Sequence, residues 1–149
     1  MALENSSERK PTQDKMLVDS CILVYLVDKT EKGKHEKARQ WFETIRWEKN
    51  YFVSIQNLRE YANISLRKTA LPAGEIVENI SLFSETFNTV FDRVEDITAA
   101  IGLAGTRGKL FWDAMLAATM QRHGINTILT ENTKDFKKFK EIKATNPLE

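Results

Sequence analysis

Short apolar runs alternate along the chain with longer segments in which apolar residues recur at helical spacing. Residues 16–18, 51–53 and 127–129 form compact apolar runs, and 89–91 and 142–144 repeat the pattern. Runs of this length with β-branched or aromatic side chains predict buried strands. Because helical segments separate them, their order predicts an α/β fold, with a mostly parallel central sheet flanked by helices.

The helical segments each carry one apolar face. The run from Ile22 to Val27 follows the first strand directly and predicts a short helix, with one long strand as the alternative. Ser54 is a suitable N-cap for the helix that follows the second strand. Further helices are predicted over residues 35–47, after Pro72 and Gly74, over 97–104, and over 113–123, where Gly124 provides the stop.

Acidic side chains stand where these elements begin or end. Asp19 closes the first strand, and Glu60 and Asp113 lie on predicted helices that start near the same edge of the sheet. The segment after residues 127–129 adds Asn132 and Asp135. In open α/β sheets, ligands bind beyond the carboxyl ends of the strands. These positions, far apart in sequence, are therefore expected to share one rim.

Carboxylates gathered at one rim predict a cation site. Two ionised carboxylates about 5 Å apart repel each other by roughly 3 kcal/mol at an effective dielectric constant near 20, and this repulsion raises their pKa values. A hard divalent ion such as Mg²⁺ or Mn²⁺ relieves the repulsion and prefers oxygen ligands. Water held by such an ion can be aimed at a phosphodiester. The reaction expected from this cluster is metal-dependent phosphodiester hydrolysis.

The composition is that of a single globular domain. The chain has 149 residues, and 22 basic against 21 acidic side chains leave a net charge of +1. No global basic field is present, so contact with nucleic acid would rest on a local patch. The only cysteine, Cys21, excludes an internal disulfide, and no apolar stretch approaches the roughly 18 residues of a membrane span. We expect a cytoplasmic protein without membrane contact, with a solvated extension over residues 1–14 and one domain over 15–147.

Four motifs follow one another along the chain. The first is Leu17-Val18-Asp19-Ser20, and the others are residues 54–60 ending in Glu60, residues 111–118 around Asp113, and residues 129–136. In this order they resemble the motifs of PIN-domain ribonucleases, most closely the VapC-type toxins of toxin–antitoxin pairs. The resemblance covers residues 16–147, nearly all of the chain outside its N-terminal tail. It implies a PIN-like three-layer fold and a divalent-metal endoribonuclease.

The resemblance also implies roles for individual residues. Asp19, Glu60 and Asp113 would be the catalytic and metal-binding acids, and the fourth position would fall to Asp135 or to Asn132. Thr130 would hold the last loop by hydrogen bonding, with Ser20 supporting the site. The chain departs from the family pattern at Cys21, where many members have Asn after the Asp-Ser pair.

Each acidic candidate has an ordinary structural interpretation as well. Asp19 and Asp113 both suit the N-cap of a helix, and Glu60 suits a solvated helical face. The basic residues Lys134 and Lys137 are expected either to contact RNA phosphates or to form solvated surface. The combination of the acids, more than any one of them, indicates a nuclease.

Aromatic residues and partners complete the expectations. Trp112 precedes Asp113 and is the tryptophan expected to contact RNA, whereas Trp41 has the neighbours of a core residue. The family implies Mg²⁺ or Mn²⁺, a transfer or ribosomal RNA substrate, a cognate antitoxin and a homodimer. Two alternatives stay open: an RNA-processing PIN nuclease without an antitoxin, and a non-catalytic PIN-fold binding module.

Overall fold

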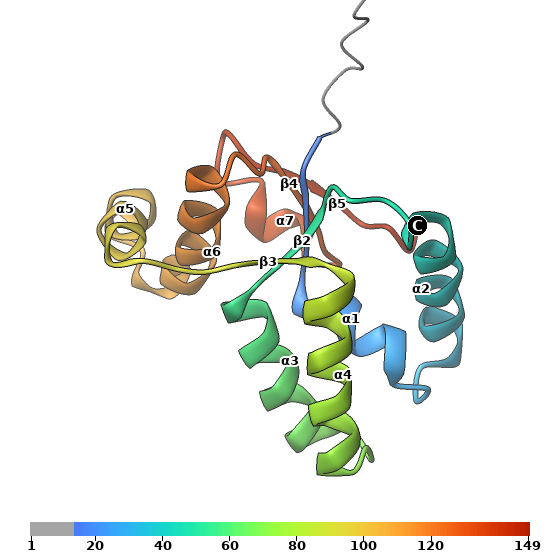
Figure 1. Cartoon of the computed structure of the whole chain (residues 1–149). Helices are drawn as coiled ribbons and strands as arrows, with labels where there is room; N and C mark the ends of the chain where they lie inside the picture. Colours follow the sequence, from blue (N-terminus) through green and yellow to red (C-terminus); the bar gives the residue numbers. More distant parts are fainter. Residues whose placement is uncertain (1–13) are drawn as a thin grey trace, which may run out of the picture.

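A computed structural model describes residues 14–149, and these residues form a five-stranded parallel sheet between two layers of helices (Figure 1). The strand order is β3-β2-β1-β4-β5, so the first strand lies at the centre. The strands are β1 (Met16–Val18), β2 (Tyr51–Ser54), β3 (Asn88–Val90), β4 (Thr127–Leu129) and β5 (Lys143–Thr145). The predicted α/β class and parallel sheet are confirmed.

The helices follow the strands in alternation, as the apolar pattern predicts. They are α1 (Ser20–Val27), α2 (Lys32–Ile45), α3 (Ile55–Lys68), α4 (Ala73–Thr86), α5 (Val94–Ala104), the 3₁₀ turn η1 (Gly108–Leu110), α6 (Phe111–Arg122) and α7 (Thr133–Phe136). None of the helices in the described part of the chain is long and apolar enough to cross a membrane. The predicted extension over residues 1–14 falls, apart from residue 14, outside the described residues.

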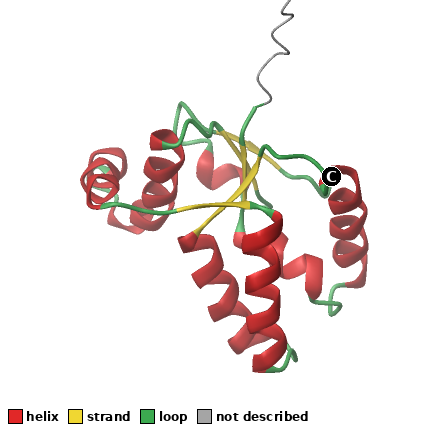
Figure 2. Ribbon diagram, viewed as in Figure 1, coloured by secondary structure: helices red, strands yellow, loops and turns green. Residues whose placement is uncertain are grey.

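Alternation along the central strands divides the apolar residues between two cores. Leu17 and Ile128 point into a core shared with α5, α6 and the segment around Phe136. Val18 and Leu129 point the opposite way, into a core shared with α1, α2, α3 and α4. Successive strand residues face opposite sides of a sheet, so each central strand serves both layers. Figure 2 shows the strands crossing between the two groups of helices.

Local sequence explains how two of the helices begin. Asp19 takes an extended conformation and accepts a hydrogen bond from the Ser20 N–H, which starts α1 directly after β1. The alternative of one long strand over this region is therefore wrong. The Ser54 side chain accepts a hydrogen bond from the Asn57 N–H, and the Asn57 side chain accepts one from the Ser54 N–H. This reciprocal capping box confirms Ser54 as the N-cap of α3.

A partly buried ion pair joins α5 to α6. Asp96 is 2% exposed, and both of its carboxylate oxygens accept hydrogen bonds from the Arg122 guanidinium, at 2.8 Å each. Its Oδ2 also accepts a bond from the Arg93 N–H at 2.8 Å, which caps α5. The same guanidinium donates to the Phe91 carbonyl. One side chain of α6 therefore holds both the start of α5 and the chain that leads into it.

Candidate functional site

Asp19 stands at the carboxyl end of β1 and is 6% exposed. Its Oδ1 accepts hydrogen bonds from the Ser20 N–H at 2.8 Å and from the Asn57 amide at 3.3 Å. Its Oδ2 accepts a bond from the Thr130 hydroxyl at 2.7 Å. Burial is the largest effect on this carboxyl and raises its pKa, while the Thr130 and Ser20 hydrogen bonds oppose the rise and Glu60 adds to it. The helix-cap interpretation of Asp19 is correct. The residue also belongs to the group of acids at this edge of the sheet, Asp19, Glu60, Asp113 and Asp135 (the acidic rim).

Thr130 links the last loop to the first strand. Its hydroxyl donates to Asp19 and accepts a hydrogen bond from the Asn132 N–H at 3.1 Å. The Cys21 sulfur lies 3.8 Å from this hydroxyl and 3.9 Å from Asp19 Oδ2. Burial, with the charge of Asp19, raises the pKa of the thiol to about 11. At neutral pH Cys21 is thus a neutral neighbour of the site and adds no negative charge.

Glu60 lies in the second turn of α3 and is partly buried near Asp19. Its Oε2 accepts a hydrogen bond from the Ser20 hydroxyl at 2.9 Å. Its Oε1 accepts one from the Gln56 amide at 2.9 Å. The solvated-face interpretation of Glu60 is therefore wrong, since Ser20 and Gln56 hold both carboxylate oxygens toward the rim.

Asp113 lies in the first turn of α6 and is half-buried. The position that caps this helix belongs to Leu110, without a side-chain hydrogen bond, so the N-cap interpretation of Asp113 is wrong. Its carboxylate accepts no hydrogen bond from any residue between 14 and 149. Burial raises its pKa to about 6, and the charges of Asp135, Asp19 and Glu60 act in the same direction, in that order. The charge of Lys138 opposes them.

The four acids therefore lie within electrostatic range of one another at the carboxyl ends of the central strands. In the positions they occupy, no three His, Cys, Asp or Glu side chains among residues 14–149 are close enough to hold an ion together. The donor set nevertheless suits a hard divalent cation, because it consists of carboxylate oxygens. The unpartnered Asp113 carboxylate, with its raised pKa, is the group that a cation would satisfy.

The remaining predicted site residues line the rim in different ways. Asn132 is exposed and provides the backbone N–H that Thr130 binds, while Asp135, also exposed, acts on Asp113 through its charge. Lys134 and Lys137 are exposed on and after α7. The Trp112 side chain is 67% exposed beside Asp113, whereas Trp41 packs partly buried against the core beneath α2, as expected.

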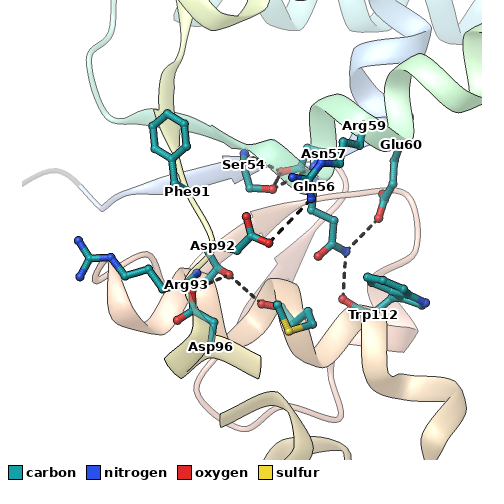
Figure 3. A network of polar contacts seen from close by, with 12 residues as sticks. Ser54, Gln56, Asn57, Arg59, Glu60, Phe91, Asp92, Arg93, Asp96 and Trp112 are labelled. Atoms are coloured by element: carbon teal, nitrogen blue, oxygen red, sulfur yellow. Dashed lines mark hydrogen bonds and ion pairs between the residues drawn. The ribbon is translucent and has the colours of Figure 1, made fainter. Parts of the chain in front are cut away.

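Gln56 and Asn57 organise the acids and were not among the predicted site residues. Gln56 donates to Glu60 and to the Trp112 carbonyl at 3.0 Å, and so joins α3 to α6 (Figure 3). Asn57 caps α3 and donates to Asp19. The spacing of Gln56 and Glu60, four residues apart on one helix, is the signal that was available. The link to Trp112 has no counterpart in local sequence.

An ion pair anchors the loop between β4 and α7 from outside the rim. Glu131 accepts hydrogen bonds from the Tyr25 hydroxyl at 2.6 Å and from the Lys34 ammonium at 2.5 Å. The bonds from Lys34 and then Tyr25 hold the pKa of Glu131 below its usual value. Glu131 lies between Thr130 and Asn132, so α1 and α2 restrain the loop that reaches Asp19.

Comparison with known proteins identifies the family. The PIN domain family matches residues 16–142, which is most of the chain, and the protein belongs to this family. The resemblance drawn from the motifs, and the PIN-like fold it implies, are confirmed. No curated protein sequence matches the chain significantly.

Solved structures of VapC-type proteins share the fold. The chain is similar to VapC20 of Mycobacterium tuberculosis, described as a sarcin-ricin loop cleaving toxin, with 14% identity and a TM-score of 0.68 over 83% of this chain and 94% of that one. A toxin–antitoxin complex from Klebsiella pneumoniae is 21% identical, with a TM-score of 0.64 over 89% of this chain and 98% of that one. DNA-bound VapBC from Salmonella typhimurium is 16% identical, with a TM-score of 0.64 over 90% of this chain and 98% of that one.

Proposed function

We propose that this protein is a divalent-metal-dependent endoribonuclease and the toxin of a VapBC-type toxin–antitoxin pair, acting in the cytoplasm. The observation that carries the proposal is the Asp113 carboxylate. It is half-buried, it has no hydrogen-bond donor among residues 14–149, and burial, together with the charges of three other acids, raises its pKa to about 6. A PIN-family sheet presents this group at the edge where α/β folds bind ligands.

The proposed metal ligands are Asp19, Glu60 and Asp113, with Asp135 as the fourth acid. A bound Mg²⁺ or Mn²⁺ would make an attacking water more acidic and neutralise charge on the scissile phosphate. Thr130 and Ser20 hold the Asp19 carboxylate in one orientation through neutral donors. Because these donors carry no positive charge, they leave the Asp19 carboxylate without a cationic partner, and the ion would supply one.

The proposed substrate is transfer or ribosomal RNA. VapC20, which shares the fold, is described as cleaving the sarcin-ricin loop. Exposed Lys134 and Lys137 lie beside Asp135 and offer contacts to phosphates that flank the cleaved bond. Because the net charge of the chain is only +1, this local basic segment would supply the attraction that the whole surface lacks.

The proposed protein partners are a cognate antitoxin and a second copy of the chain. Structures of toxin–antitoxin complexes from several bacteria share the fold, which supports the antitoxin. An apolar stripe on α5, made of Val94, Ile97 and Ile101, supports the homodimer, since these side chains are 76%, 44% and 60% exposed. Light scattering of the parent protein and of Ile101→Glu tests it. A parent that is monomeric at micromolar concentration contradicts it.

Cleavage of transfer and ribosomal RNA in Mg²⁺, Mn²⁺ or EDTA tests the proposed activity. The parent should cleave in either metal and not in EDTA, and Asp19→Asn should be inactive. Asp14→Asn is the matched control, because Asp14 is exposed just before the opposite end of β1. Equal cleavage by the parent and Asp19→Asn would refute the proposed site. A parent inactive on every RNA would favour the non-catalytic module, and activity without an adjacent antitoxin reading frame would favour RNA processing.

A further inference from the structure

A cleft of about 470 Å³ opens beside the acidic rim. Three elements form it: α3, the loop that leads from β3 into α5, and the first turns of α6. Its lining residues are Gln56, Arg59, Glu60, Asn63, Asp92, Trp112 and Met115. Figure 3 shows Glu60 and Trp112 on either side of the Gln56 amide, with Asp92 across from them near Arg59. The volume falls in the range of sites for small ligands.

Two apolar side chains of α6 line one wall of the cleft. The Trp112 side chain is 67% exposed, whereas Met115, three residues further on, is 5% exposed. The exposed indole of Trp112 offers a flat apolar surface, and the buried Met115 beside it extends that apolar wall into the protein. Aromatic faces of this kind stack unpaired bases, at a gain that does not depend on which base is bound.

Polar groups with free hydrogen-bonding capacity line the opposite wall. Arg59 and Asp92 approach only to 3.9 Å, and their side chains are 69% and 35% exposed. Asn63 is exposed on α3, and within the described residues its side chain makes no hydrogen bond. The cleft thus offers a carboxylate with two acceptors, a guanidinium with spare donors and a free amide.

We propose that this cleft is the subsite for an unpaired guanine of the RNA, a proposal that rests on the proposed ribonuclease function. Guanine alone among the four bases places two neighbouring donors, N1–H and the N2 amino group, opposite a carboxylate. Asp92 accepts from these donors, while Arg59 donates to the O6 and N7 acceptors that guanine also presents. The base stacks on Trp112.

Glu60 connects this subsite to the acidic rim. Its carboxylate lines the cleft and also accepts the Ser20 hydroxyl bond that leads to Asp19. Gln56 holds Glu60 and the Trp112 backbone together. A nucleotide whose base lies on Trp112 therefore has its sugar–phosphate backbone beside the acids. The subsite determines which nucleotide adjoins the cleaved bond.

Titration of the metal-free protein with nucleosides tests the subsite without requiring cleavage. The probe is guanosine, with adenosine, cytidine and uridine for comparison, and the signal is the indole N–H resonance of each tryptophan. Guanosine should shift the Trp112 resonance, and the other nucleosides should bind roughly tenfold more weakly. Asp92→Asn should keep the shift but lose the preference for guanosine. Trp112→Ala lacks the reporting indole, so equilibrium dialysis with guanosine measures its binding, which should be lost.

Trp47→Ala is the matched control, because Trp47 is 81% exposed and lies outside the cleft. It should bind guanosine like the parent. Equal shifts by guanosine and adenosine, or no shift at Trp112, would overturn the subsite. If Asp92→Asn fails to fold, Arg59→Met should weaken the preference instead. A protein that cleaves RNA without binding guanosine refutes the subsite alone, whereas one that binds guanosine and cleaves no RNA refutes the nuclease alone.

Discussion

Asp19 and Asp96 are both nearly removed from solvent, at 6% and 2% exposure, yet their surroundings shift the two pKa values in opposite directions. Hydrogen bonds from Arg122 hold the pKa of Asp96 below its usual value, against the effect of burial. Burial raises the pKa of Asp19, which receives bonds only from neutral hydroxyl, thiol, amide and backbone donors among residues 14–149. One carboxylate is neutralised within the protein, and the other keeps its charge unpaired.

The difference separates an acid that holds the fold together from one that is proposed to bind a metal ion. A buried acid paired with an arginine joins two helices, and it has no charge left to offer a ligand. A buried acid held by neutral donors is positioned at some expense of stability and retains its affinity for a cation. Burial alone does not distinguish the two, but the partner does.

The largest expected effect on stability is that of Asp96→Asn. The substitution leaves Arg122 beside a neutral amide and weakens the cap of α5, so we expect the free energy of unfolding to fall by about 3 kcal/mol. Urea denaturation at pH 7 measures it. Asp92→Asn serves as the control, because its ion pair with Arg59 is long and exposed and is expected to contribute at most about 1 kcal/mol. Equal losses in both variants would contradict the structural role of Asp96.

The next effect is a pH dependence centred on Asp113. Its pKa is about 6 in the folded protein against 3.8 for the free group, so the folded state binds the proton more tightly. Its contribution to stability is present below pH 3.8 and is lost as the pH rises through 6. Asp113→Asn should therefore exceed the metal-free parent in stability at pH 7 and match it near pH 4. Urea denaturation in EDTA at several pH values measures this.

Asp96 provides a control with the opposite pH dependence. Asp96 has a lowered pKa, so its contribution has the opposite sign: it is present above pH 3.8 and is lost as the pH falls through the folded value. The slope that Asp113→Asn removes should accordingly remain in Asp96→Asn. A large drop in the melting temperature of Asp113→Asn at pH 7 would instead make Asp113 a structural residue.

A divalent cation should stabilise the parent and leave the acidic-rim variants unchanged. Binding to the folded state alone raises the melting temperature in proportion to the logarithm of ion concentration. We expect Mn²⁺ to raise the melting temperature of the parent and of Asp14→Asn, and to have no such effect on Asp113→Asn. A thermal shift series in Mn²⁺ measures it, and an equal rise in all three proteins would place the ion elsewhere.

The smallest expected effect is that of Lys34→Met. The substitution removes the ammonium that restrains Glu131, so the loop carrying Thr130 gains freedom while the acids stay in place. We expect a slightly weaker Mn²⁺ affinity with little change in unfolding free energy. Lys37→Met, on the same helix and exposed, is the control. An affinity equal to the parent's would show that the ion pair does not affect the rim.

The spacing of the apolar residues predicted the sheet and most helices, because the buried face of each core strand or helix is visible as a regular spacing within its own residues. The strands at 16–18 and 127–129 agree with the prediction to the residue. The four-residue helix Thr133–Phe136 is too short to show a period, and it was missed. The helix predicted over 97–104 begins at Val94 because a carboxylate three residues past Arg93 caps it, a contact that apolar spacing does not reveal.

The ordered motifs predicted the acids of the rim, but no motif or spacing predicted that Asp96 is buried and paired. In sequence it is one of several acids between residues 92 and 96, with nothing to mark it as buried. Its partner, Arg122, lies 26 positions away on another helix. The link between Gln56 and the Trp112 carbonyl spans 56 positions. Contacts of this kind depend on tertiary packing, and a single sequence holds no record of them.

The central place of β1 has a consequence for synthesis. This strand leaves the ribosome first, yet one of its two neighbours is β4, more than a hundred residues later. Until that late segment emerges, Asp19 lacks its Thr130 partner and Asp113 lacks the charge of Asp135. The acidic site is therefore complete only after residues 127–135 have been made, and the proposed activity could begin only from that point of synthesis.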